Sequence, residues 1–301
     1  MKKPLVSVII LNWNRKEDVS ETLIRLKNQT YKNFEVIVVD NASTDGSLSH
    51  FRRNFPEIKI VGLDKNYGLY GWNFGMRSAM GEYLLLLASD SRIKNDLIKK
   101  HVEKLNHNKA IGVSCPATYE LKTKRYLGPN RAKKGNDIKG YRVTYFDGNG
   151  ICLKREVFEK TGGYDEDYFI CLEELEWAVR ILKEGFDIAC FTDCVVYHKK
   201  SKKGGDYRRR MGFYYCRNWI WFYLKYLPLR QIPAFLLLHI KSFFIKTNAK
   251  GTMRKTDCLK GLLASINKAP KYLKKREPLS ETTLERVKLD LFPNPGHLYI
   301  S

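Results

Sequence analysis

The 301-residue sequence lacks the two glycine patterns that mark the commonest nucleotide-binding folds. The turn after the first apolar run, Asn12-Trp13-Asn14-Arg15, contains no glycine, so the G-x-G-x-x-G pattern is absent where it would have to stand. No Gly-Lys dipeptide occurs anywhere, which removes the P-loop. These absences argue against a dinucleotide-dependent dehydrogenase and against a P-loop kinase.

Signs of secretion are missing as well. The chain has seven cysteines, an odd number that disfavours a disulfide framework and favours a reducing compartment. Only about seven apolar-type residues follow Met1-Lys2-Lys3-Pro4 before Asn12, too few for the apolar core of a signal peptide. We therefore expect a cytoplasmic location.

Acidic residues are scarce beside basic ones: 54 Lys and Arg against 32 Asp and Glu give a formal net charge of +22. Such an excess attracts anions, among them nucleic acid, anionic lipid and nucleotide phosphates. The excess is concentrated in the last third of the chain, in the runs at 199–203, 208–210 and 271–276. The sequence thus predicts a basic C-terminal surface.

Long uncharged apolar runs are also lacking in the C-terminal part. Residues 207–226 mix aromatic and basic side chains, and the apolar stretch 232–245 is interrupted by His239 and Lys241. Neither reaches the roughly 20 apolar residues of a membrane-spanning helix. The mixture of Trp, Tyr, Lys and Arg is typical of helices that lie in the membrane interface at the inner face of the cell membrane, the alternative being two ordinary packing helices.

The first hundred residues alternate between apolar runs of strand length and helical periods. We expect strands at 5–11, 34–39, 58–62 and 83–87, with helices between them. Asn14 and Glu17 have the spacing of a capping box, so Asn14 is expected to cap the first helix. This alternation implies right-handed crossovers and an α/β fold with a mostly parallel sheet flanked by helices.

Beyond Cys115 the regular alternation of strand and helix patterns ends. A helical period over 173–184 ends at Gly185. The remaining patterns predict a hairpin at 117–128, a strand at 145–153, a helix at 155–161 and closing strands at 186–191 and 195–197. We expect one α/β domain over 1–205, with halves at about 1–115 and 116–205, followed by a basic, aromatic, helical extension over 206–301.

Two of the apolar runs stop at a carboxylate, Asp40 and Asp90, and asparagines stand at the same strand ends. Carboxyl ends of parallel strands meet at one edge of a sheet, where α/β proteins bind ligands. Asp40 could accept a hydrogen bond from a nucleobase imide or a ribose hydroxyl, and Asp90 could hold a divalent cation that bridges phosphates. The alternative is that each residue serves only its own turn or helix cap.

Four blocks of sequence resemble the family 2 glycosyltransferases, especially their rhamnosyltransferase-like branch. The resemblance runs over about residues 5–200, and its blocks lie at 6–14, 38–47, 66–73 and 162–169 with Glu173-Glu174. It implies a GT-A fold, an inverting mechanism, a nucleotide-sugar donor and a Mg²⁺ or Mn²⁺ ion.

The resemblance also implies roles for single residues. Asp90 stands at the last acid of the family's D-x-D-like metal motif, in which Ala88 replaces the earlier acid. Glu174 stands where the family has its catalytic Asp, with Glu173 beside it, and His198 matches a recurring His that contacts metal or diphosphate. The positions assigned to the nucleotide are Asn12, Asn14, Asp40, Asn41, Asn66 and Asn73.

For three groups of residues, the residues taken without the resemblance allow more than one interpretation. Glu173 and Glu174 begin a predicted helix. Either could be the base that deprotonates an acceptor hydroxyl, but acidic residues are also common at helix starts without any catalytic role. Asp147 and Gly148 precede a predicted strand and would line the donor-sugar or acceptor pocket, or form a plain turn. Cys190, Cys194 and His198 have a zinc-like spacing without a fourth ligand, so we reject zinc.

The sequence as a whole predicts a metal-dependent inverting glycosyltransferase that uses a UDP- or dTDP-sugar. The basic, aromatic extension predicts a glycan or glycolipid acceptor at a membrane surface, in polysaccharide or glycolipid synthesis, with no nucleic acid as partner. Two alternatives stay open: a catalytically silent sugar-nucleotide binder, favoured by Ala88 and Glu174, and a nucleic-acid-binding protein, favoured by the charge.

Overall fold

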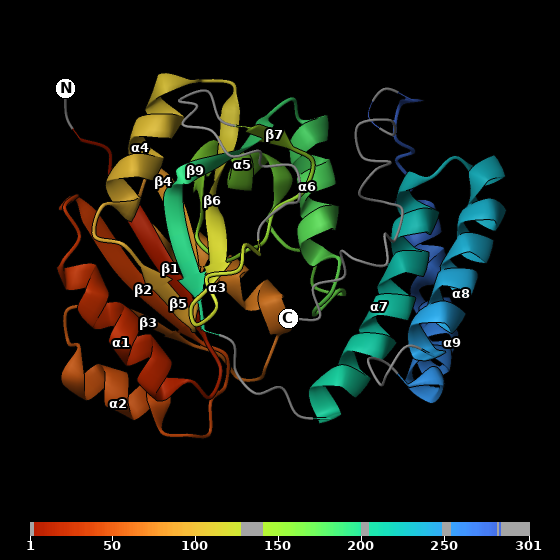
Figure 1. The fold of residues 1–301 in the computed structure, drawn as a ribbon, viewed down its shortest axis with the longest axis horizontal. Coiled ribbons are helices and arrows are strands. Elements are labelled where there is room, and N and C mark those ends of the chain that lie inside the picture. Colours follow the sequence, from red (N-terminus) through yellow and green to blue (C-terminus); the bar gives the residue numbers. More distant parts are fainter. Residues whose placement is uncertain (1–2, 128–140, 200–204, 249–253, 282, 284–301) are drawn as a thin grey trace. The chain divides into compact units, whose positions relative to one another are not determined.

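The computed structural model describes residues 3–127, 141–199, 205–248, 254–281 and 283 (Figure 1). Side chains are not described at 205–210 and 241–248. Contacts divide the chain into two compact units. The first unit comprises residues 1–166 and 177–200, and the second, here the tail unit, comprises 167–176 and 201–301. Each unit is described by itself.

The first unit is built on a mixed sheet that has nine strands within the described residues, in the order β3-β2-β1-β4-β8-β6-β9-β5, with β7 paired to β9. The strands are β1 Val6–Asn12, β2 Phe34–Asp40, β3 Lys59–Gly62, β4 Tyr83–Ala88, β5 Ser91–Ile93, β6 Ile111–Glu120, β7 Tyr141–Val143, β8 Ile151–Lys154 and β9 Asp187–His198. Strands β3, β2, β1 and β4 are parallel neighbours, as are β6 and β9. The predicted α/β fold with a largely parallel sheet is confirmed.

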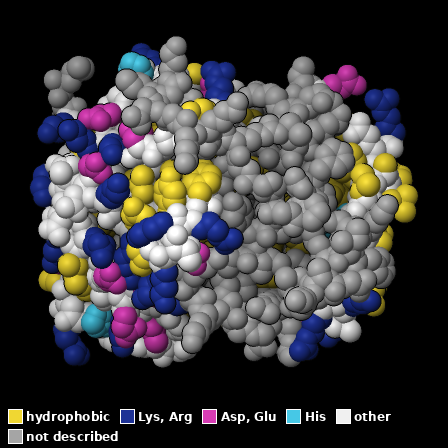
Figure 2. All heavy atoms as spheres, viewed as in Figure 1, with side chains coloured by type: hydrophobic (Ala, Val, Ile, Leu, Met, Phe, Trp, Pro, Cys, Tyr) yellow, Lys and Arg dark blue, Asp and Glu magenta, His cyan; other side chains and the backbone are white. Residues whose placement is uncertain are grey.

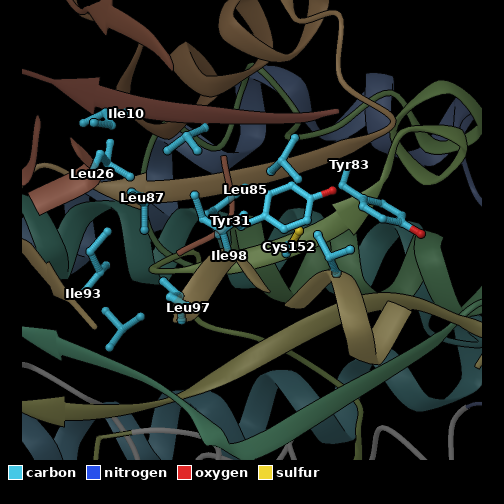
Figure 3. Packing of buried hydrophobic residues seen from close by; sticks show 14 of the residues in the cluster. Ile10, Leu26, Tyr31, Tyr83, Leu85, Leu87, Ile93, Leu97, Ile98 and Cys152 are labelled. Carbon is cyan, nitrogen blue, oxygen red and sulfur yellow. The ribbon is translucent and has the colours of Figure 1, made fainter. Parts of the chain in front are cut away.

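Helices cover both faces of this sheet (Figure 1). The helices of the first unit are α1 Lys16–Lys27, α2 Ser47–Asn54, α3 Gly71–Ser78, α4 Leu97–His107, α5 Arg155–Thr161 and α6 Glu173–Lys183, whose first turn belongs to the tail unit, with a 3₁₀ turn at Gly68–Tyr70. Because side chains alternate along a strand, Val8 and Ile10 pack in one cluster with α1, α2 and α4, while Ile9 and Leu11 pack in another with α3, α5 and α6. Figure 3 shows part of the first cluster.

Three local predictions are corrected. Helix α1 begins at Lys16 with no side-chain cap, so the expected capping box at Asn14 does not form. The strand expected at 145–153 is confined to β8, and the two expected closing strands are one long strand, β9. The hairpin expected at 117–128 is confirmed over its described residues, where Tyr119 pairs antiparallel with Tyr126 and the backbone N–H of Leu127 donates to the carbonyl oxygen of Thr118 at 2.7 Å. Helix α4 was not predicted.

The tail unit contains three helices within its described residues, α7 Gly205–Tyr226, α8 Ile232–Asn248 and α9 Lys255–Lys274, with a 3₁₀ turn at Leu229–Gln231. Helix α9 packs closely along α7, since a Cβ added at Gly261 would lie 2.2 Å from the carbonyl oxygen of Phe213. The rings of Trp221 and Tyr272 stack between the two helices with centroids 5.0 Å apart. In the described part of the chain, every helix is too short or too polar to cross a bilayer.

Candidate active site

Strands β1, β2 and β4 end together at one edge of the sheet. Asn12 pairs in register with Asp40, and Leu11 pairs with Ala88, so the segments that carry Asn12, Asp40 and Asp90 all leave the sheet at the same edge. The sequence predicted this arrangement from the parallel strands alone. The predicted roles of these residues are a separate matter and stay predictions.

Asn12 and Asp40 form a buried hydrogen-bonded pair. Asn12 Nδ2 donates to Asp40 Oδ2 at 2.8 Å, and the backbone N–H of Ser43 donates to Asp40 Oδ1 at 2.9 Å. The two side chains are 0% and 2% exposed. Asn12 Oδ1 is also buried and has no hydrogen-bond partner among the described residues, so the described part of the protein leaves one acceptor of this pair unsatisfied.

The loops that follow β1 and β2 are locked together. Asn14 has a positive φ of 53° and Ala42 a positive φ of 59°, and Asn14 Oδ1 accepts a hydrogen bond from the backbone N–H of Thr44 at 2.7 Å. This contact is the reason that Asn14 does not cap α1. Instead the carboxylate of Asp45 accepts hydrogen bonds from the backbone N–H groups that begin α1 and α2, at 3.1 and 3.0 Å.

Asp45 was not among the predicted site residues. Burial alone would raise the pKa of its carboxyl, but the hydrogen bonds from Ser47 and from backbone N–H groups outweigh burial and hold the pKa below its ordinary value. Asp45 ends the polar run Asn41-Ala42-Ser43-Thr44-Asp45 just ahead of a helix, a position from which a capping role could have been predicted.

Asn41 and Asn66 lie together, whereas Asn73 is held elsewhere. Asn41 Nδ2 donates to Asn66 Oδ1 at 2.8 Å, and Asn41 Oδ1 accepts from the backbone N–H of Tyr67 at 2.9 Å. The amide of Asn73 is buried against the turn before Asp165, where it bonds the backbone N–H and C=O of Tyr164 at 3.0 and 2.9 Å. The structure thus uses Asn73 to fix that turn.

Asp90 and His198, the two predicted metal ligands, face each other. His198 Nε2 lies 3.1 Å from Asp90 Oδ1, and their side chains are 20% and 14% exposed. The antiparallel pairing of β5 with β9 places Ser91 opposite His198 and so brings the two together. No cluster of three or more His, Cys, Asp or Glu suited to a metal is present among the described residues.

This pair fits one kind of metal. Mg²⁺ is usually bound by one or two protein carboxylates plus water and substrate phosphates, and a hard cation of this kind needs no third side chain. The Asp90 carboxylate therefore suits Mg²⁺ or Mn²⁺ bound together with a diphosphate, whereas the His198 imidazole nitrogen is not a donor that Mg²⁺ prefers. The donors do not suit a structural zinc ion, which takes four protein ligands.

An ion pair between the exposed Lys199 and the largely buried Asp18 anchors the end of β9 beside His198. Lys199 Nζ donates to Asp18 Oδ1 at 2.7 Å, and the backbone N–H of Lys199 donates to the carbonyl oxygen of Asp90 at 3.0 Å. Burial would raise the pKa of Asp18, but hydrogen bonds from Lys199 and Arg92 outweigh it, so the carboxyl pKa is lowered. Asp18 and Lys199 were not predicted, because nothing in the sequence pairs residues so far apart.

Asn149 is a second unpredicted residue at this edge. Its Oδ1 accepts hydrogen bonds from the backbone N–H of Ala88 at 3.4 Å and from the hydroxyl of Ser91, while its Nδ2 is buried without a hydrogen-bond partner among the described residues. Asp147 Oδ1 accepts from the backbone N–H of Asn149 at 3.0 Å. The predicted turn at Asp147 and Gly148 thus presents Asn149 to the Ala88–Ser91 segment.

Glu173 and Glu174 belong to the tail unit, since residues 167–176 group with 201–301. They form the first turn of α6, directly after Phe169, Cys171 and Leu172, which all have positive φ angles of 63–71°. Glu176, one turn further, is buried and accepts hydrogen bonds from Lys225 at 2.8 Å and from Tyr226 at 2.7 Å. Of the three acids of this turn, Glu176 is thus engaged in a buried ion pair.

Comparisons with known proteins agree with this fold. The chain is 27% identical to an uncharacterized glycosyltransferase of Haemophilus influenzae over 60% of this chain and 63% of that protein. It is 33% identical to a putative teichuronic acid biosynthesis glycosyltransferase, TuaG, of Bacillus subtilis over 34% of this chain and 42% of that protein. It is 25% identical to the dTDP-rhamnosyl transferase RfbF of Shigella flexneri over 67% and 71%. The chain thus spans less than two thirds of the first two relatives.

A solved structure has a similar fold. It is the mannosyltransferase PcManGT of Pyrobaculum calidifontis in complex with GDP-Man and Mn²⁺, with a TM-score of 0.56 and 20% identity over 96% of this chain and 76% of that chain. This likeness shows a GT-A-like fold. Rhamnosyltransferases are one distant branch among the several that the relatives represent. The family model "Glycosyl transferase family 2" matches residues 7–162, just over half of the sequence, and the chain therefore belongs to this family of glycosyltransferase enzymes.

Proposed function

We propose that this protein transfers a sugar, with inversion, from a UDP- or dTDP-sugar to a hydroxyl group of a glycan or glycolipid during cell-surface polysaccharide synthesis. Relatives named for O-antigen and teichuronic acid biosynthesis support the setting. The observation that carries the proposal is the common end of β1, β2 and β4, where Asp40 and Asp90 leave the sheet together. Nucleic acid is not proposed as a partner.

The Asn12–Asp40 pair is proposed to bind the nucleoside. Asn12 Oδ1 is a buried acceptor without a hydrogen-bond partner among the described residues, and such an atom in a native fold calls for a ligand or a water. The Asp40 carboxylate beside it suits a ribose hydroxyl or the imide N–H of uracil or thymine. Asn14, Asn41 and Asn66 hold the loops around this pair, whereas Asn73 is bonded to the backbone of Tyr164, and its predicted contact with the nucleotide rests on the family resemblance alone.

Asp90 and His198 would hold Mg²⁺ or Mn²⁺, whose charge would offset the negative charge that develops on the departing diphosphate. The Mn²⁺ in the similar mannosyltransferase structure supports this assignment. Asn149 offers a buried N–H donor at the same edge, next to the turn at Asp147 and Gly148 that is proposed to line the sugar or acceptor pocket.

Glu174 is proposed as the general base, with Glu173 beside it at the start of α6. The acceptor oxygen forms a bond to the anomeric carbon on the face opposite the diphosphate, and the bond from that carbon to the diphosphate oxygen breaks. The electron pair leaves with the diphosphate, and the acceptor proton passes to the Glu174 carboxylate. Attack from the opposite face inverts the anomeric centre.

A surface of exposed apolar and basic side chains on the tail unit supports a lipid-linked acceptor at the inner face of the cell membrane. Along α9, Leu259, Leu263, Ile266 and Leu273 recur at helical spacing and are 43–65% exposed. Lys255, Lys260 and Lys274 of the same helix are exposed too. Figure 2 shows hydrophobic side chains at the surface over α8 as well, where Leu237 and Leu238 are exposed. Apolar side chains beside lysines are typical of a helix that binds anionic lipid.

A donor panel tests the catalytic proposal. The purified full chain with Mn²⁺ should transfer sugar from a UDP- or dTDP-sugar to a lipid-linked acceptor, and Glu174→Gln should lower kcat by about 10²- to 10⁴-fold. Glu184→Gln, at the exposed residue directly after the same helix, is the matched control and should keep wild-type activity. Nucleotide binding by calorimetry without turnover of any donor would instead identify a silent binder.

Vesicle co-sedimentation tests the membrane proposal. The protein should bind vesicles with anionic lipid more strongly than neutral ones, and Leu263→Ser with Ile266→Ser should release it. Ile24→Ser, an exposed apolar position on α1 of the first unit, is the control and should not change binding. Equal binding by the double variant and the wild type would contradict this part.

A further inference from the structure

We infer that helix α7 of the tail unit is a clasp that positions the base: Arg217 and Asn218 hold the strained segment Phe169–Leu172 in the conformation that presents Glu174. This inference rests on the proposed role of Glu174. It makes the C-terminal helices a part of the catalytic machinery, where the sequence had predicted a separate extension with only a membrane role.

The segment before Glu173 cannot hold its own shape. Phe169, Cys171 and Leu172 have φ angles of 63°, 71° and 65°, in the left-handed region that side-chain-bearing residues rarely adopt. Three such residues in a stretch of four persist only where surrounding contacts enforce them, and such strain is concentrated at functional sites. The segment leads directly into the first turn of α6.

Helix α7 supplies the contacts that enforce this backbone. Asn218 is fully buried, and its Nδ2 lies within hydrogen-bond distance of three carbonyl oxygens: that of Tyr168, just before the segment, at 3.0 Å, and those of Ile170 and Cys171, within it, at 2.9 and 2.7 Å. Arg217 Nη2 donates to the carbonyl oxygens of Asp167 at 2.7 Å and Tyr168 at 3.1 Å. Two consecutive side chains thus bind the backbone carbonyl oxygens of Asp167, Tyr168, Ile170 and Cys171, within the segment and just before it.

Neighbouring residues fix the clasp itself. Arg217 Nε donates to Asn218 Oδ1 at 2.9 Å, so each side chain orients the other. The Arg217 guanidinium lies 4.2 Å from the ring centroid of Trp221, which adds a cation–π contact. Tyr214, one turn before, stacks on Phe169 with centroids 5.0 Å apart. The face of α7 that carries these residues therefore packs against the segment.

Both ends of the segment are tied to the tail helices by charge. The Asp167 carboxylate accepts hydrogen bonds from Lys268 and, at 2.6 Å, from Lys271, both on α9. Glu176 accepts from Lys225 at 2.8 Å. Glu174 lies between these two anchors and within a few residues of the strained backbone, so a loss of the clasp would displace its carboxylate while the anchors remain.

The test compares Asn218→Ala and Arg217→Lys with Arg276→Ala in the full chain. Arg276 is the matched control because its guanidinium also binds two backbone carbonyl oxygens, those of Leu224 and Leu227, at the far end of α7 and away from the segment. Three quantities are measured: kcat for transfer from the active donor, nucleotide affinity by calorimetry, and hydrogen exchange of the amides of residues 167–174.

Asn218→Ala should lower kcat by about 10²-fold, the usual effect of a misplacement of about 1 Å, with nucleotide affinity unchanged and faster exchange in the segment. Arg217→Lys, which keeps the charge and one donor, should give a smaller fall, and Arg276→Ala should keep wild-type kcat. Faster exchange with kcat equal to that of the control would overturn the positioning role. Unchanged exchange in Asn218→Ala would overturn the clasp whatever the activity, whereas a wild type without transfer from any donor would refute the proposed function instead.

Discussion

Replacing Asp40 with asparagine perturbs the nucleotide half of the site while keeping its shape. The Asp40 carboxylate accepts hydrogen bonds from Asn12 Nδ2 and from the backbone N–H of Ser43, so an amide at position 40 places a donor against one of them. A flip of the Asn12 amide would let Asn12 Oδ1, which has no hydrogen-bond partner among the described residues, accept a hydrogen bond from the new amide at position 40. The fold should therefore lose only about 1 kcal/mol, the net worth of one hydrogen bond.

Nucleotide binding should suffer more than the fold. A hydrogen bond to a charged acceptor contributes about 1.5–3 kcal/mol, and 1.4 kcal/mol is tenfold in affinity, so Kd for the nucleoside diphosphate should rise about 10- to 100-fold. Calorimetry measures Kd, and urea unfolding measures stability. Asp64→Asn, an exposed aspartate whose carboxylate accepts from Tyr67, is the control and should bind normally. An Asp40→Asn variant that binds as the wild type does would refute the reasoning, because Asp40 would then serve only the Ser43 turn.

Three further predictions concern stability. Burial lowers the pKa of His101 to about 3, well below its value in the unfolded chain, so folded His101 stays neutral while the unfolded chain takes up a proton as pH falls. The free energy of unfolding should therefore drop by about 2 kcal/mol between pH 7 and pH 5. In urea titrations at several pH values, His101→Gln should remove this part of the pH dependence. Burial would raise the pKa of the Asp167 carboxyl, but the two lysines of α9 outweigh burial and the pKa is lowered. The stabilisation that these ion pairs give is present above about pH 4 and is lost as pH falls through the folded pKa. Asp167→Asn should therefore destabilise the tail unit at pH 7 and make its stability less dependent on pH in acid, as measured by circular dichroism. Gly261→Ala would place a methyl group 2.2 Å from the Phe213 carbonyl oxygen, and should cost about 1–3 kcal/mol in urea unfolding where Lys260→Ala costs little.

The sequence predicted best what depends on local pattern. Apolar runs that end at Asp40 and Asp90 are a property of neighbouring residues, and parallel pairing then brings their ends to one edge. Helix α4 was not predicted, although Leu97, His101 and Leu105 recur at helical spacing on its buried side, so the local pattern is sufficient to predict this helix.

Other features could not be predicted, because they depend on contacts between distant segments. Asn14 has the local signal of a helix cap, but a hydrogen bond from Thr44, thirty residues away, takes its side chain. The grouping of 167–176 with the C-terminal helices follows from the bonds that Asn218 and Lys225 make across about fifty residues. Pairings of this kind follow from the packed fold, and no spacing in the sequence announces them.

The most direct test is a crystal structure of the protein with Mn²⁺, a non-hydrolysable sugar nucleotide and an acceptor. The account predicts the base or ribose against Asn12 and Asp40, the ion between the diphosphate and the Asp90–His198 pair, and the Glu174 carboxylate in hydrogen-bond reach of the acceptor hydroxyl, about 2.6–3.2 Å. A nucleotide bound elsewhere, or a Glu174 carboxylate too far from that hydroxyl to be bridged by one water, would contradict it.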